Sequence, residues 1–160
     1  MLRQLTMAPR SRAELQATLD ARQVPTDVAQ SVLDRMEELS LVDDAAFAQA
    51  WVRSRHAGRG LSRRALSHEL YRKGIDAEVA AAALDTVDDA DERETARRLV
   101  TRRLHTTRGL DRVTRTRRLA GMLARKGYSG GVVQQVVREA LDAEGTEQEL
   151  DRDVVRPSGH

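Results

Sequence analysis

The sequence predicts an all-α protein, a small array of helical repeats, on two observations. One pattern of apolar and basic residues occurs three times with a period of about fifty residues, as in repeat architectures. The composition is 40% hydrophobic but only 2% aromatic, which favours helices packed through small aliphatic side chains. The three copies of the pattern are Leu15, Leu19, Arg22, Val24, Val28 and Leu33; Leu66, Leu70, Lys73, Ile75, Val79 and Leu84; and Leu119, Leu123, Lys126, Tyr128, Val132 and Val137.

Each copy is typical of two short helices joined at a tight corner. Leu66 and Leu70 repeat at i and i+4, and a basic residue and a glycine follow before the second periodic run. A glycine suits a backbone that enters the left-handed region after a helix, which costs other residues about 1 kcal/mol or more. Gly74 and Gly127 are therefore predicted to end helices in this conformation. The first copy has Gln23 at this position, so we expect its corner to be built differently.

Capping residues and apolar stripes predict the other helices. A helix with Phe47 and Trp51 on one stripe precedes the second copy, and a helix that starts near Asp91 or Glu92 holds the same place before the third. The predicted starts and caps of the remaining helices are Ser11 with Glu14 in a capping box, Thr26, Asp43, Asp76 and Ser129, and the predicted connections are residues 56–60, 86–91 and 105–111.

Phe47 and Trp51 have two interpretations. Burial preference makes them the large core residues of an otherwise aliphatic protein. The alternative is an exposed platform on which nucleic-acid bases stack, which requires several aromatic residues in a basic groove. The chain has one Trp, two Tyr and one Phe, so we expect the core role.

The charges alternate in blocks, although the formal net charge is only +2. Such a distribution is typical of a protein that binds polyanions or acidic protein surfaces with part of its surface. The basic blocks are residues 53–73 and 97–126, and the acidic blocks are residues 76–94 and 139–153.

Arginine supplies the densest candidate chemistry. Pairing with acids on a solvated helix face explains about half of the individual arginines. It does not explain runs without nearby acids, such as residues 97–103 and 115–118, because close like charges repel unless an external anion offsets them. The candidate binding residues are Arg53, Arg55, Arg59, Arg63, Arg64, Arg97, Arg98, Arg102, Arg103, Arg112, Arg115, Arg117 and Arg118.

No motif in the sequence requires catalysis. His68 and Glu69 begin a zinc-protease pattern, but Arg72 stands where the second histidine is needed, so the metal would have one ligand too few. Residues 58–60 lack the lysine and hydroxyl residue of a phosphate-binding P-loop. We therefore predict that the protein is not an enzyme and has no catalytic residue, cofactor or metal.

The sequence also bears on the compartment. There is no cysteine, so a disulfide framework or a thiolate metal site is excluded. No apolar run approaches the twenty or so residues that span a bilayer, and the N-terminus has no signal-peptide pattern. We expect a cytoplasmic protein that does not contact membranes.

With the repeats in view, the chain resembles the RecX family of bacterial regulators of the RecA recombinase. The match extends over essentially the whole chain up to about Glu144, and the order of the motifs is more specific than any one of them. The residues that carry it are 39–48 (LSLVDDAAFA), 51–55 (WVRSR), 69–70 (EL), 73–75 (KGI) and 123–128 (LARKGY).

The resemblance implies tandem three-helix repeats in an elongated or crescent-shaped array that binds the RecA nucleoprotein filament and inhibits its ATPase, strand-exchange and co-protease activities. It implies a role in recombinational DNA repair and the SOS response. We expect a monomeric protein, with single-stranded DNA as a further partner and duplex DNA as a second candidate. The main alternative is a helical protein that binds DNA directly. The expected divisions are a first repeat at 1–42 that looks shortened at its N-terminus, repeats at 43–90 and 91–144, and a frayed or disordered polar tail at 145–160.

Overall fold

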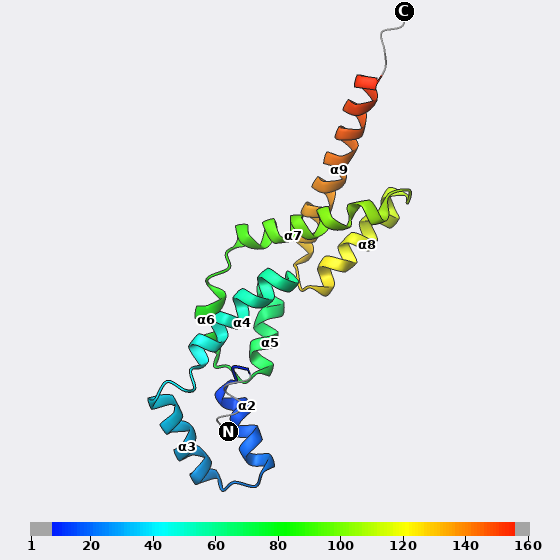
Figure 1. Ribbon diagram of the computed structural model, residues 1–160. Helices are drawn as coiled ribbons and strands as arrows, with labels where there is room; N and C mark the ends of the chain where they lie inside the picture. The colour runs from blue at the N-terminus through cyan, green and yellow to red at the C-terminus, as the bar shows by residue number, and fades with distance from the viewer. Residues whose placement is uncertain (1–7, 156–160) are drawn as a thin grey trace, which may run out of the picture. The chain divides into compact units, whose positions relative to one another are not determined.

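The computed structural model describes residues 8–155, and all regular structure in this range is helical (Figure 1). The predicted all-α class is confirmed. The chain divides into two compact units, the N-terminal unit Met1–Val87 and the C-terminal unit Asp88–His160. Within the described range, no helix is both long and apolar enough to cross a membrane.

The N-terminal unit contains two helical repeats, each with its own hydrophobic core. Leu15 and Leu33 are fully buried in the first core, and Leu66 and Leu70 in the second. These are positions of the repeated pattern, so the pattern marks the side chains that each repeat buries. The helices are α2 (Arg12–Ala21) and α3 (Thr26–Glu38) in the first repeat and α4 (Asp44–Arg59), α5 (Arg63–Arg72) and α6 (Ala77–Leu84) in the second.

The C-terminal unit is a single three-helix repeat. Its first and last helices pack against each other and against the middle helix, and Leu119 and Leu123 of the middle helix are buried between them. The elements are α7 (Asp89–Leu104), the short 3₁₀ helix η1 (His105–Thr107), α8 (Arg112–Arg125) and α9 (Gly130–Val155).

The corner after the middle helix has the same conformation in all three repeats. Gly74 and Gly127 have φ angles of 72° and 92°, as predicted, and Gln23 has a φ angle of 61°. The expectation of a different corner at Gln23 is therefore wrong, because a Schellman motif forms at each corner and outweighs the cost of a side chain in the left-handed region. The hydrogen bonds that define the motif are donated by the N–H groups of Val24, Ile75 and Tyr128 to the carbonyls of Leu19, Leu70 and Leu123.

Several predicted boundaries differ from the structure. The predicted loop at 56–60 is mostly helix, because α4 continues to Arg59 and ends at Gly60, which has a φ angle of 65°. Helix α7 starts at Asp89 rather than near Asp91 or Glu92, because Asp88 and Asp91 form a capping box. Helix α9 continues to Val155, so the tail expected to be frayed or disordered from residue 145 is helical up to that residue. Residues 156–160 lie outside the described range.

The two repeats of the N-terminal unit are joined at the second corner. The Ser11 hydroxyl donates to the Lys73 carbonyl at 2.7 Å, and the Lys73 ammonium pairs with Glu14 at 2.6 Å. A Cβ atom on Gly74 would lie only 2.3 Å from the Cβ of Ala13. Gly74 is therefore required twice, for its backbone conformation and for the close approach of α2.

The core role expected for Phe47 and Trp51 agrees with the structure. Phe47 is 8% exposed, and half-buried Trp51 packs against the same core. The rings stack with centroids 5.7 Å apart, and the Trp51 indole N–H donates to Glu69 at 2.8 Å. Arg55 lies over the Trp51 ring, with its guanidinium carbon 4.2 Å from the ring centroid.

We predict opposite stability changes for two corner substitutions. Gln23→Gly should stabilise the protein by about 0.5–1 kcal/mol, because glycine removes the strain of a side chain in the left-handed region. Gly74→Ala should destabilise it by about 2–4 kcal/mol, because the strain of alanine in the left-handed region is added to the clash of its Cβ atom with Ala13. Urea unfolding followed by circular dichroism measures both changes.

Gly58→Ala is the matched control for these variants. Gly58 is inside α4, and a Cβ atom added to it would meet nothing within 4 Å, so alanine there should stabilise by at most about 1 kcal/mol. A Gly74→Ala protein as stable as the wild type would contradict the role given to this corner.

Candidate functional site

The thirteen candidate arginines are distributed over one pair of helices in each unit. Three lie on α4 and two on α5 in the N-terminal unit, and four lie on α7 and four on α8 in the C-terminal unit. The structure separates them into arginines that carboxylates already neutralise and arginines that have no such partner.

On α7 and α8, several candidates belong to the paired group. Arg97 lies 3.5 Å from Glu94 and 3.8 Å from Glu139, and Arg112 pairs with Asp142 on α9. The hypothesis that Arg97 belongs to a run without nearby acids is therefore wrong. The partner Glu139 is distant in sequence and lies next to Arg97 only because α9 packs against α7.

The same hypothesis is wrong for Arg115. Its guanidinium pairs with Glu144 at 2.8 Å, with only 14% and 9% of the two side chains exposed. It also donates to the Thr107 hydroxyl at 3.0 Å and to the Leu104 carbonyl at 3.3 Å. Arg115 therefore connects α8, η1 and α9, and its charge is used inside the fold.

In the N-terminal unit, Arg59 lies 3.8 Å from Glu69 and Arg63 lies 3.8 Å from Asp85. Arg55 is occupied by its contact with Trp51. Arg53 and Arg64 are exposed, and within the described part of the chain no carboxylate lies within 4.0 Å of either guanidinium. These two remain available for an external anion.

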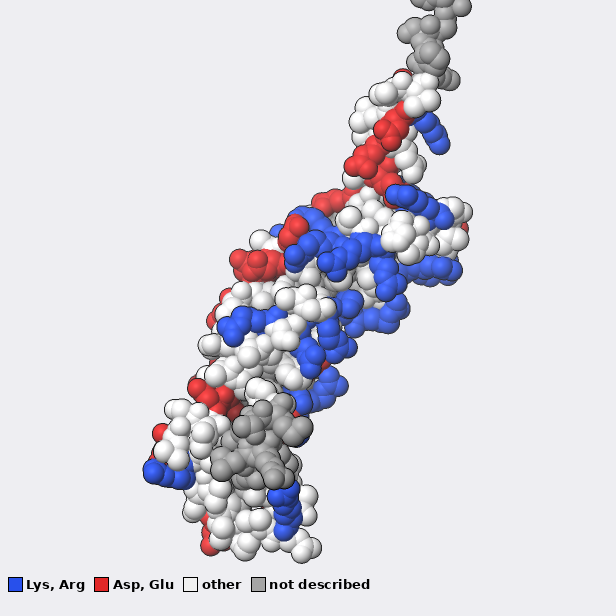
Figure 2. All heavy atoms as spheres, viewed as in Figure 1, with Lys and Arg blue, Asp and Glu red and all other residues white. Residues whose placement is uncertain are grey.

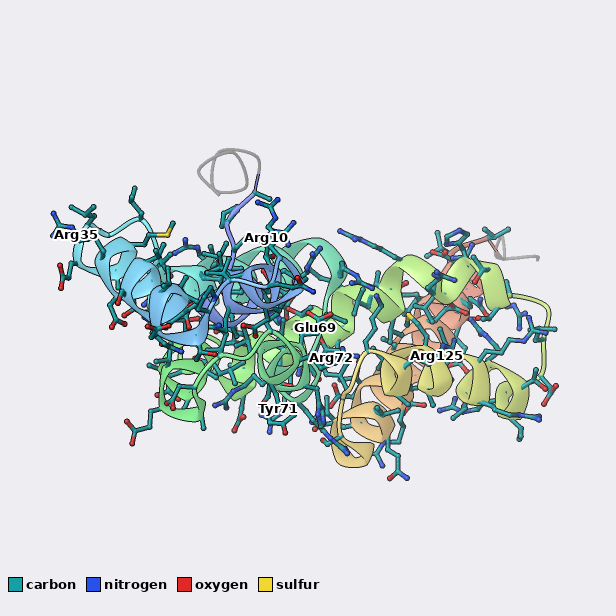
Figure 3. All side chains as sticks on the ribbon, turned by 90° about the horizontal axis from the view of Figure 1, so that it is seen from below. Arg10, Arg35, Glu69, Tyr71, Arg72 and Arg125 are labelled. Atoms are coloured by element: carbon teal, nitrogen blue, oxygen red, sulfur yellow. The ribbon has the colours of Figure 1, made fainter. Side chains whose placement is uncertain are left out.

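The unpaired arginines of the C-terminal unit come together around one hollow. Arg103 of α7 and Arg117, Arg118 and Arg125 of α8 line a cavity of about 450 Å³, which we call the arginine hollow. Considering residues 8–155 only, none of the four has a carboxylate within 4.0 Å. Basic side chains cover the surface at α8 in Figure 2, and Figure 3 shows Arg125 on this helix. The rest of the lining is Thr106, Thr107, Leu119, Gly121 and Met122.

Helix α8 is held in place at both ends. At its start, Asp111 accepts hydrogen bonds from the hydroxyl of Thr114 at 2.6 Å and from its backbone N–H at 3.2 Å. The hydrogen bond from the hydroxyl has the largest effect and the one from the backbone N–H comes next. Both stabilise the charged carboxylate and lower the pKa of Asp111. At its end, Tyr128 follows the glycine corner and is 5% exposed, and burial raises the pKa of its phenol. Three of the four arginines of the hollow thus project from a helix that is anchored at both ends.

The hollow suits an anion with several charged oxygens. Guanidinium groups form paired hydrogen bonds with phosphate or carboxylate, and they stay charged at every physiological pH. The volume is in the range of ligand-binding pockets, and half-buried Met122 adds apolar surface. Because four unpaired positive charges repel each other, a bound polyanion would lower the electrostatic energy.

Three of the four arginines that line the hollow, Arg103, Arg117 and Arg118, were predicted from the sequence as binding residues, but Arg125 was not. The omission has a local cause, because Arg125 precedes a lysine and a glycine at a predicted helix end, where a cation is explained by the helix dipole. Arg98 and Arg102 are exposed on α7 but do not line the hollow. A spacing of eight residues between Arg117 and Arg125, about two helical turns, would have placed both on one face.

The fold and this surface define a class of helical-repeat protein with a basic face. Comparison with protein families identifies the class further. Models described as the first, second and third three-helix domains of RecX match residues 1–36, 43–84 and 90–137. The chain belongs to the RecX family.

Relatives and solved structures agree with this assignment. Proteins named regulatory protein RecX from Streptomyces coelicolor and Thermobifida fusca are 55% and 56% identical, over 92% and 91% of this chain and 79% of each relative. The protein of the same name from Mycobacterium avium is 47% identical over 89% of this chain and 83% of its own length. The crystal structure of RecX from Lactobacillus salivarius has a TM-score of 0.78 at 21% identity, covering 86% of this chain and 90% of that one, and so supports the fold.

The division into paired and unpaired arginines predicts different effects on stability. Arg115→Ala should destabilise the protein by about 3 kcal/mol, because it removes the close ion pair of the buried Glu144 carboxylate and leaves only Arg108, 4.0 Å away. Arg117→Ala should change the free energy of unfolding by no more than about 0.5 kcal/mol, because it removes an exposed, unpaired charge. Denaturant unfolding of the two variants makes the comparison, and equal stabilities would contradict it.

Proposed function

We propose that this protein is a non-enzymatic, monomeric, cytoplasmic regulator that binds the RecA nucleoprotein filament. In this proposal it inhibits the ATPase, strand-exchange and co-protease activities of RecA, and so modulates recombinational DNA repair and the SOS response. The observation that carries the proposal is the arginine hollow in a chain of the RecX family. A nucleoprotein filament offers the two kinds of surface that unpaired guanidinium groups bind, phosphates and carboxylates.

The charge distribution supports a target that contains protein as well as nucleic acid. The basic faces alternate with acidic segments, and the acidic segments lower the attraction to bare DNA. The second candidate function is direct binding to single-stranded or duplex DNA, which the same hollow favours through phosphate contacts. The two candidates differ in whether RecA is needed.

Charge reversal in the hollow tests the proposal. The double variant Arg117→Glu/Arg118→Glu should weaken inhibition of the RecA ATPase on single-stranded DNA at least about tenfold, because two attractive contacts become repulsive. Binding to RecA-coated DNA should also depend less on salt, by a logarithmic slope of about 0.7 for each single-strand phosphate contact that is lost. Titration into a RecA ATPase assay at several salt concentrations measures the first effect, and binding to RecA-coated DNA over the same salt range measures the second.

The control is Arg138→Glu/Arg152→Glu on α9, which changes the net charge equally. Both residues are exposed and lie outside the hollow, so this variant should inhibit almost as well as the wild type. Equal loss in both variants would mean that only net charge matters. A wild-type protein that binds naked and RecA-coated DNA equally, without changing the ATPase, would reject the regulator and favour the direct DNA binder.

A further inference from the structure

Tyr71 is the one aromatic residue among those described that lies almost fully in solvent. It is 81% exposed on α5, whereas Phe47 and Tyr128 are 8% and 5% exposed and Trp51 is half-buried. It does not take part in any of the hydrophobic clusters of residues 8–155. Core packing therefore does not explain this ring.

The residues around Tyr71 form a basic face. Arg72 at its edge also lines a hollow with Glu14 and Glu69, but neither carboxylate is within 4.0 Å of its guanidinium. Arg64, His68 and Arg72 are exposed and lie with Tyr71 within an arc of about 100° on α5, opposite the buried side of the helix. In the described part of the chain, no carboxylate is within 4.0 Å of Arg64 or Arg72. The acid of this helix, Glu69, is bonded to Trp51, and Figure 3 shows it on the other side of α5 from Tyr71.

The arginines of this face recur in the third repeat. With Leu66 equivalent to Leu119, Arg64 and Arg72 are equivalent to Arg117 and Arg125, which line the arginine hollow. The pair is about 12 Å apart along the helix axis, two turns at 1.5 Å per residue. The same two positions thus carry unpaired arginines on the middle helices of the second and third repeats.

We propose that the Tyr71 face of α5 binds single-stranded nucleic acid, with the ring stacked on an unpaired base and Arg64 and Arg72 in contact with the flanking phosphates. Aromatic rings stack on every base, and arginine side chains follow the backbone, so such a face is tolerant of sequence. A base inside a duplex is already stacked on its neighbours, which excludes duplex DNA from the ring. An acidic peptide would satisfy the arginines but would leave the ring unused.

Binding of two fluorescent oligonucleotides of equal length, one of thymidines and one with abasic sites throughout, tests the proposal. Tyr71→Ala should weaken binding of the thymidine strand at least about fivefold, the lower range for loss of one stacked base. It should leave binding of the abasic strand unchanged. Tyr71→Phe keeps the ring and should bind both strands like the wild type.

Two further variants separate the phosphate contacts from the stacking contact. Arg64→Ala/Arg72→Ala should weaken binding of both strands, whereas Ser67→Ala on the same helix should weaken neither. Circular dichroism verifies that each variant is folded, as expected for exposed positions.

Unchanged affinity of Tyr71→Ala for thymidines, an equal loss on the abasic strand, or no binding of either strand by the wild type would overturn the proposal. The outcome is independent of the RecA ATPase assay, so a failure of the proposed function is distinguishable from a failure of this site.

Discussion

The Schellman corner that follows the middle helix of each repeat is the constraint on which the rest of the structure depends. A single left-handed residue lets the N–H group of the next residue bond to the leucine carbonyl five positions earlier, and this fixes where the middle helix ends and the last helix begins. The unpaired arginines of α5 and α8 stand on middle helices, and they project into solvent because the leucines on the opposite side of each helix are buried. In the N-terminal unit the corner has a second use, because the Lys73 carbonyl accepts the Ser11 hydroxyl and joins two repeats.

The arginines of this chain differ in how much they contribute to stability. Exposed pairs such as Arg97 with Glu94 contribute at most about 1 kcal/mol, whereas the buried pair of Arg115 and Glu144 costs several kcal/mol to break. Within residues 8–155, none of the four arginines of the hollow forms an ion pair that would stabilise the fold. Their mutual repulsion is a cost to folding, which the anion of the proposed function would offset.

Much of the fold could be predicted from the sequence, because apolar spacing, caps and glycines act over a few residues. The corner at Gln23 could not be predicted, because the hydrogen bonds of the turn outweigh the poor fit of a glutamine to the left-handed region. The length of α9 could not be predicted either, because a helix that has started extends through residues of low helix preference. For the site, the sequence indicated which helices are basic but not which charges are free. Glu139 and Glu144 neutralise arginines from a different helix, and only tertiary packing decides such partners. Trp51 and Tyr71 likewise differ in burial. Trp51 lies on the side of α4 that packs against the core, whereas Tyr71 lies on the side of α5 opposite its buried leucines.

The first repeat lacks the pair of exposed arginines that the middle helices of the other two repeats carry. The equivalents of Arg64 and Arg72 in α2 are Ala13 and Ala21, and Ala13 is the residue that packs against Gly74 of the next repeat. An arginine at position 13 has no room at that contact, so a position that carries charge in the later repeats is used for packing in the first. The outward face of each middle helix therefore depends on what lies beside it: another repeat packs on it in the first case, whereas in the other two the arginines are exposed.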